Sequence, residues 1–151
     1  MKRTLLIAIL FSWILPWLFS APPPSKSTLE IRFEGIRTSK GMIAIGINTS
    51  EEGWPRKPQM ELQWVKGELK DGVFVARIPD LPYGTYAVSV LDDENSNLEM
   101  DMVLGIPKEG WGFSENPPFK LSAPKFSECA FKINQPVHQI TISLRYAGKG
   151  K

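Results

Sequence analysis

The sequence predicts an all-β protein, an antiparallel β-sandwich of about seven strands. Apolar and polar residues alternate in several short runs, as in residues 29–34, where three apolar residues alternate with three charged ones. Gly, Pro, Asp and Asn separate these runs, and no segment after residue 20 shows a helical period. Such alternation puts apolar groups on one face of each strand, and two sheets can bury these faces against each other.

The strands are short and are bounded by turn residues. The first two, at 28–37 and from Ile43 to Ile47, are expected to pair as a hairpin around Gly41. One long structured loop is expected after the fifth strand, from Leu104 to Asn116, because it is rich in Gly and aromatic residues. A barrel is the alternative architecture. The remaining strands are predicted at Trp64–Val65, 73–78, 86–90, 126–133 and 137–146.

Residues 1–20 are expected to form a signal helix that is removed on export. Two basic residues come first, the segment from Leu5 to Phe19 is almost unbroken apolar sequence, and Ser20 is a small residue suited to cleavage. An uncleaved anchor is the alternative, although Pro16 interrupts the run and its length is at the short limit for a bilayer. The expected product is periplasmic or secreted, with no stable membrane span, and has a Pro-rich linker at 21–27, a β-sandwich domain at 28–146 and a flexible tail at 147–151.

The charge balance argues against nucleic acid as a partner. The chain has 18 Lys and Arg residues against 16 Asp and Glu residues, and Lys2 and Arg3 leave with the signal. The rest of the chain is near neutral and lacks a basic stripe that would neutralise phosphates.

Few residues suit catalysis. His138 is the only histidine and Cys129 the only cysteine, so a zinc site built from several such residues cannot form within one chain. His138 is interpreted as a structural or surface residue. Cys129 is interpreted as a small buried residue on the same strand face as Phe131 and Ile133. No catalytic residue is assigned and the protein is expected not to be an enzyme; an acid–base hydrolase that uses the carboxylates of segment 92–101 is the alternative.

The same acidic segment resembles a calcium loop in its spacing, because oxygen-bearing side chains recur at every second position. Leu98 stands where such loops use glycine for a sharp turn, and Leu104 stands where they use a bidentate acid. A β-bulge or a solvated turn explains the cluster equally well. Calcium is therefore the one cofactor considered, with Asp93, Asn95, Asn97, Glu99 and Asp101 as its candidate ligands.

Aromatic residues gather in the Gly- and Pro-rich loops. Trp54, Trp111 and Phe113 are the candidate platform for stacking on a sugar ring or a peptide. The alternative is a small satellite core under the long loop, because a loop of this length must bury something to stay ordered.

Several motifs together resemble a known family. The segment Leu81–Val90 is similar to the turn and strand of transthyretin-like and immunoglobulin-like modules. With Gly53-Trp54-Pro55, the acidic loop, the Gly-Ile-Pro-Lys-Glu-Gly block at 105–110 and Ala130-Phe131, it resembles the bacterial family called domain of unknown function twenty-one forty-one over about 28–146. The resemblance implies an exported immunoglobulin- or transthyretin-like β-sandwich with no assigned activity. Members similar to this chain carry a histidine in place of Asp92 and a glycine in place of Leu98, which sets this acidic loop apart.

The function expected from these observations is non-enzymatic. The domain is expected to act in the periplasm by binding or structural association, through the end of the sandwich that carries the 92–116 loops, with an unknown protein, peptide or glycan as its partner. A calcium-stabilised module and a carbohydrate- or peptide-binding module are the alternatives.

Overall fold

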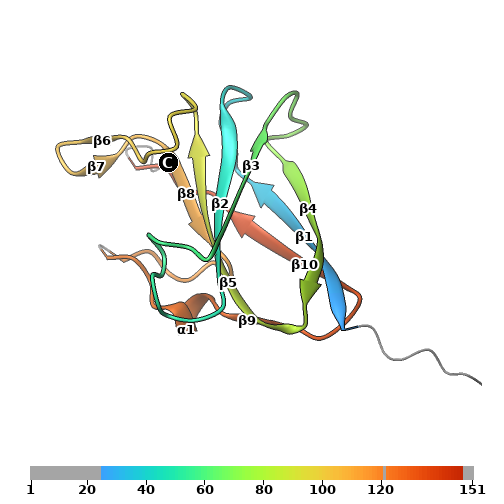
Figure 1. The fold of residues 1–151 in the computed structure, drawn as a ribbon. Coiled ribbons are helices and arrows are strands. Elements are labelled where there is room, and N and C mark those ends of the chain that lie inside the picture. The colour runs from blue at the N-terminus through green and yellow to red at the C-terminus, as the bar shows by residue number, and fades with distance from the viewer. Residues whose placement is uncertain (1–24, 121, 148–151) are drawn as a thin grey trace, which may run out of the picture.

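The computed structural model describes residues 25–120 and 122–147, and two β-sheets form its body (Figure 1). The predicted signal helix and the end of the predicted tail lie outside these residues. The smaller sheet has the order β10-β1-β4. Its strands are β1 at Lys26–Glu34, β4 at Phe74–Pro82 and β10 at Val137–Ser143.

The larger sheet has the order β3-β2-β5-β8, and β9 pairs with the beginning of β5. Its strands are β2 at Met42–Asn48, β3 at Met60–Val65, β5 at Gly84–Asp93, β8 at Gly110–Phe113 and β9 at Phe131–Ile133. A small separate hairpin consists of β6 at Met102–Val103 and β7 at Ile106–Pro107. Neither main sheet closes into a barrel within the described residues.

The apolar rows predicted from the alternation face each other between the sheets. Leu29, Ile31 and Phe33 of β1 have no exposed surface, and Ile43 of β2 and Val88 of β5 are equally buried. Burial of such side chains stabilises the fold by roughly 1.5–3 kcal/mol each. The larger sheet packs one face on this core. Its opposite face points away from the core and carries the site described below.

The predicted hairpin between the first two strands is wrong. β1 pairs with β4 and, in parallel, with β10, whereas β2 pairs with β3 and β5. Beyond β1 the chain turns at Gly35, which has φ of 79°, and the N–H of Ile36 donates to the carbonyl of Gly72, just before β4, at 3.0 Å. Gly41 then has φ of 75° and lies so close to Asp93 that a Cβ would overlap that residue's carbonyl. The segment from Gly35 to Gly41 therefore crosses from the smaller sheet to the larger one. Because β1 and β10 are parallel, the sandwich is mixed and not purely antiparallel.

The strand predicted at 126–133 is also wrong in its first half. Residues Phe126–Cys129 form the short helix α1, and only Phe131–Ile133 is a strand. Glu128 explains the turn, because its carboxylate accepts the N–H of Lys125 at 2.8 Å and its own N–H donates to the Lys125 carbonyl at 3.0 Å. Cys129 is fully buried as predicted, although it lies at the end of this helix.

The long loop predicted after the fifth strand contains more regular structure than expected. It begins with the β6–β7 hairpin and ends with β8, which pairs with β5. Among the residues that the structure describes, no helix has the length and apolar character needed to cross a membrane.

Candidate functional site

A cleft of about 960 Å³ lies on the outer face of the larger sheet. Its floor consists of two cross-strand rows that the register of the sheet creates. Gly46 and Ala44 of β2 carry small side chains or none, and Pro58 packs so closely over Gly46 that a Cβ there would overlap the proline ring. One row is Glu61, Gly46, Ser89 and Phe113, and the other is Gln63, Ala44, Leu91 and Trp111.

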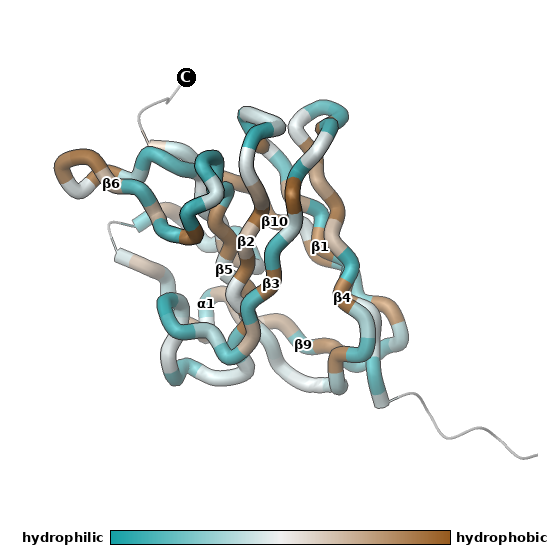
Figure 2. Tube along the Cα trace, turned by 45° about the horizontal axis from the view of Figure 1, so that its top comes forward, coloured by the Kyte–Doolittle hydropathy of each residue, from teal (hydrophilic) through white to brown (hydrophobic). Residues whose placement is uncertain are grey.

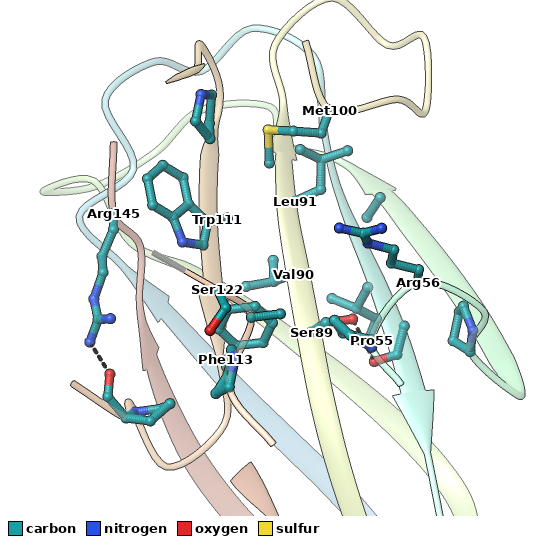
Figure 3. A pocket seen from close by; sticks show the side chains of 18 of the residues that line it. Pro55, Arg56, Ser89, Val90, Leu91, Met100, Trp111, Phe113, Ser122 and Arg145 are labelled. Atoms are coloured by element: carbon teal, nitrogen blue, oxygen red, sulfur yellow. Dashed lines mark hydrogen bonds between the residues drawn. The ribbon is translucent and has the colours of Figure 1, made fainter. Parts of the chain in front are cut away.

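Three loops form the walls of the cleft. Figure 3 shows Trp111 and Phe113 of β8 on one side, and Pro55 and Arg56 on the other. The segment 98–107, which includes the β6–β7 hairpin, borders one end, and the segment 117–124 lies beside β8. Only part of the predicted 92–116 end therefore contributes, because the cleft lies across the sheet face.

The walls expose an unusual amount of apolar surface. Leu98, Met102 and Ile106 are 55%, 52% and 56% exposed, and Phe119, in the segment beside β8, is 64% exposed. The tip of the hairpin carries Leu104, which is 97% exposed, and Figure 2 shows this apolar tip projecting from the body. Leu98, Met102, Ile106 and Phe119 border one cleft, and exposed apolar surface gathered in this way is typical of interaction sites.

The structure brings two of the three predicted platform residues into the cleft. Trp111 and Phe113 are two positions apart on β8 and both line it. Trp54 lies behind them, with its ring centroid 5.8 Å from that of Phe113 and its indole N–H donating to the Pro124 carbonyl at 2.9 Å. Phe119, which the sequence interpretation did not select, lies 6.3 Å from Trp111. Trp111 and Phe113 therefore line the cleft, whereas Trp54 packs against Phe113 outside it, and the stacking role of the three rings stays a prediction.

The charged residues of the cleft differ in how far they are already engaged. Arg145 donates to the carbonyl of Pro117 at 2.6 Å, and Lys120 contacts Glu128. Arg56 is exposed and reaches over the cleft, and it has no ion pair among the described residues (Figure 3). Arg56 is therefore the cation that a ligand in the cleft would meet.

The predicted calcium ligands belong to a loop that its own hydrogen bonds order. The carboxylate of Asp93 is buried and accepts the N–H groups of Asn97 and Leu98 at 3.2 and 2.8 Å. The amide groups of Asn95 and Asn97 donate to Asp101 at 2.7 and 3.3 Å. The side-chain oxygens of these two asparagines accept the N–H groups of Asn97 and Glu99 at 3.0 and 2.8 Å.

The backbone of this loop also explains the substituted glycine position. Leu98 has φ of 63°, a left-handed conformation that favours glycine. In the described part of the chain, no group of three or more His, Cys, Asp or Glu side chains is placed to hold a metal ion. Calcium binding at Asp93, Asn95, Asn97, Glu99 and Asp101 stays a prediction.

A buried polar cluster closes the core beside this loop. Lys66 contacts Asp92, and both side chains are fully buried. Tyr146 donates its hydroxyl proton to the other oxygen of Asp92 at 2.5 Å. Burial, and then the hydrogen bond to Asp92, raise the pKa of Tyr146 well above its ordinary value. The sequence interpretation missed the pair of Lys66 and Asp92, although Asp92 follows Val90 in the inward-facing row of β5.

The two residues considered for nucleophilic or acid–base chemistry have structural surroundings. Burial raises the pKa of the Cys129 thiol to about 12, which keeps it protonated at neutral pH. His138 stacks on Phe131, with ring centroids 5.4 Å apart and an interplanar angle of 14°. Neither residue lines the cleft.

These features define a two-sheet, all-β domain with an apolar cleft on one sheet. The model of the family described as "Uncharacterized protein conserved in bacteria (DUF2141)" matches residues 31–141, and the chain belongs to this family. No curated protein and no solved structure matches the chain.

Proposed function

We propose that this protein is a non-enzymatic binding domain of the periplasm or the cell exterior, whose cleft takes an extended apolar segment of a partner protein. The observation that carries the proposal is the coincidence of the cleft with the exposed apolar hairpin. Its volume of about 960 Å³ lies within the usual range for ligand sites, roughly 300–1,000 Å³. The export of the protein rests on the apolar segment from Leu5 to Phe19.

The lining favours a peptide over a sugar. The cleft has polar residues such as Gln63 and Ser89, but its border at Leu98, Met102 and Ile106 is apolar and exposed, which suits the apolar side chains of a peptide better than the hydroxyl groups of a sugar. Flexible methionine side chains suit contact with varied apolar side chains. Tryptophan, here Trp111, is a residue type that often carries much of the binding energy of an interface. A peptide that also bears one acidic group would meet Arg56.

Selection from a library of random linear peptides tests the proposal with the full chain as the target. We expect the enriched peptides to carry several apolar or aromatic residues and to bind in an isothermal titration. Trp111→Ala should weaken their binding by about 30-fold, which corresponds to about 2 kcal/mol. Val75→Ala is the matched control, because Val75 is 50% exposed on the smaller sheet, and it should leave the affinity unchanged.

Two results would overturn the proposal. One is a selection that enriches no apolar peptide. The other is an affinity that Trp111→Ala leaves unchanged. If the protein binds cell-wall glycans through Trp111 and binds none of the selected peptides, the result would support the carbohydrate-binding alternative.

A further inference from the structure

A lysine and an aspartate lie side by side in the interior at one end of the sandwich. Lys66 directly follows β3, and Asp92 lies in β5. Each continues an inward-facing row, Lys66 after Trp64 and Asp92 after Val90. The Nζ atom of Lys66 contacts the Oδ1 atom of Asp92, and both side chains are 0% exposed. The two groups are therefore held together by two strands and are screened from water.

A third group acts on the same carboxylate from the opposite side. The hydroxyl of Tyr146 donates to Oδ2 of Asp92 at 2.5 Å, so each oxygen of Asp92 has a different partner. Tyr146 continues the inward-facing row of β10 beyond Leu144. Because burial raises its pKa, the phenol stays protonated and keeps its role as a donor.

Keeping an ion pair at such a buried site is unfavourable in free energy. Two desolvated charges seldom repay their desolvation by attraction to each other, whereas a neutral amide costs much less to bury. Groups held in contact by a rigid fold also react far faster than the same groups free in solution. The arrangement therefore favours condensation of the two side chains over retention of the charges.

We infer that Lys66 and Asp92 form a side-chain amide bond within the folded protein. A proton first passes from Nζ to Oδ1, which leaves an amine beside a carboxylic acid. The electron pair of Nζ then forms a bond to Cγ, and the negative charge that develops on Oδ2 is held by the hydroxyl of Tyr146. A second proton moves from Nζ to Oδ1, the bond from Cγ to Oδ1 breaks, and one water molecule leaves. No other reactant is needed. The water molecule carries away Oδ1 and two hydrogens of Nζ, and the amide that remains is neutral.

The bond would tie the end of β3 to the end of β5, and it would close a loop that contains β4. The chain has one cysteine and therefore forms no disulfide within itself. A covalent bond between these strands would serve the purpose that disulfides serve in many exported domains.

Mass spectrometry of the wild-type chain in denaturant tests the inference directly. We expect an intact mass lower than that of the sequence by one water molecule. Trypsin should fail to cut after Lys66 and should yield a branched peptide that joins Lys66 to Asp92. Lys120 is the internal control, because it also contacts a carboxylate, that of Glu128, but is 52% exposed. Trypsin should cut after Lys120 completely.

An intact mass equal to that of the sequence, with complete cutting after Lys66, would overturn the inference. Lys66→Arg should restore the full mass, because a guanidinium replaces the amine nucleophile. Tyr146→Phe removes the donor to Oδ2 and should slow the reaction by about 10²-fold, so that most of the purified variant keeps the full mass. Formation as complete in this variant as in the wild type would contradict the role given to Tyr146. Neither readout depends on ligand binding in the cleft.

Discussion

Arg37 and Tyr146 lie against each other although 109 positions separate them in the chain. The guanidinium carbon of Arg37 is 4.5 Å from the centroid of the Tyr146 ring, and the N–H of Arg37 donates to the phenol oxygen at 3.3 Å. The same guanidinium binds Glu94 through two nitrogens at 2.5 and 3.0 Å. Arg37 therefore connects the segment that follows β10 to the acidic segment 92–101.

Arg37→Ala should lower the free energy of unfolding by about 1–2 kcal/mol, because it removes the cation–π contact, the Glu94 pair and a bond to the Lys108 carbonyl. The estimate is small because the side chain is 41% exposed. Urea unfolding measures the change. Arg32→Ala is the control, since Arg32 makes one exposed pair with Glu34 and should change stability by less than about 0.5 kcal/mol. Equal losses in the two variants would contradict the connecting role.

Asp93→Ala should destabilise the protein by about 1–3 kcal/mol without any metal, because two backbone N–H groups lose their acceptor. Glu99→Ala is the control, since Glu99 is exposed and should have little effect. Thermal melting with and without calcium measures both variants. A melting temperature that calcium raises in the wild type but not in Asp93→Ala would support the predicted metal site. A loss in Asp93→Ala that appears only when calcium is present would contradict the account of a loop ordered by hydrogen bonds.

Stability should fall as the pH rises above 9. The pKa of the Cys129 thiol is raised from 9.0 to about 12 in the folded protein, so the unfolded chain releases this proton first. The stabilisation is complete below pH 9 and is lost as the pH approaches 12, by up to about 1.4 kcal/mol per pH unit. Tyr146 acts in the same direction. Cys129→Ala should therefore reduce the slope of the unfolding free energy against pH without abolishing it. Urea unfolding at several pH values measures the slope, and an unchanged slope would contradict the raised pKa of the Cys129 thiol.

Gly110→Ala should destabilise the fold by about 1–3 kcal/mol, because a Cβ at Gly110 would overlap the ring of Tyr146. Gly84→Ala is the matched control: both glycines lie in strands without positive φ, and a Cβ at Gly84 would meet Tyr86 at an ordinary 3.4 Å. Urea unfolding of the two variants measures the difference. If Gly84→Ala lowers the free energy of unfolding as much as Gly110→Ala does, the effect is not steric.

The sequence predicted the local features of the fold better than the distant ones. Alternation is a local signal, and it placed Leu29, Ile31 and Phe33 in the core. The division of β1 and β2 between two sheets depends on contacts far along the chain, and no local pattern reports them. The turn that makes 126–129 helical depends on the two hydrogen bonds between Glu128 and Lys125.

For the candidate site, too, the sequence predicted local features and missed those that depend on distant segments. Trp54, Trp111 and Phe113 were selected because they cluster in Gly- and Pro-rich loops, and the structure places the last two in the cleft. The cleft itself was not predictable, because its lining combines residues of β2, β3, β5 and β8 with those of loops far apart in the chain. The buried pair of Lys66 and Asp92 likewise joins residues whose proximity only the register of the sheet defines.

The most direct test of the proposed binding site is hydrogen–deuterium exchange of the full chain with and without a selected apolar peptide. The cleft predicts slower exchange in the β6–β7 hairpin and in β8, with no change in β1 or β10. Protection confined to the end of the sandwich around Arg37 and Lys108, with the hairpin and β8 unaffected, would contradict it.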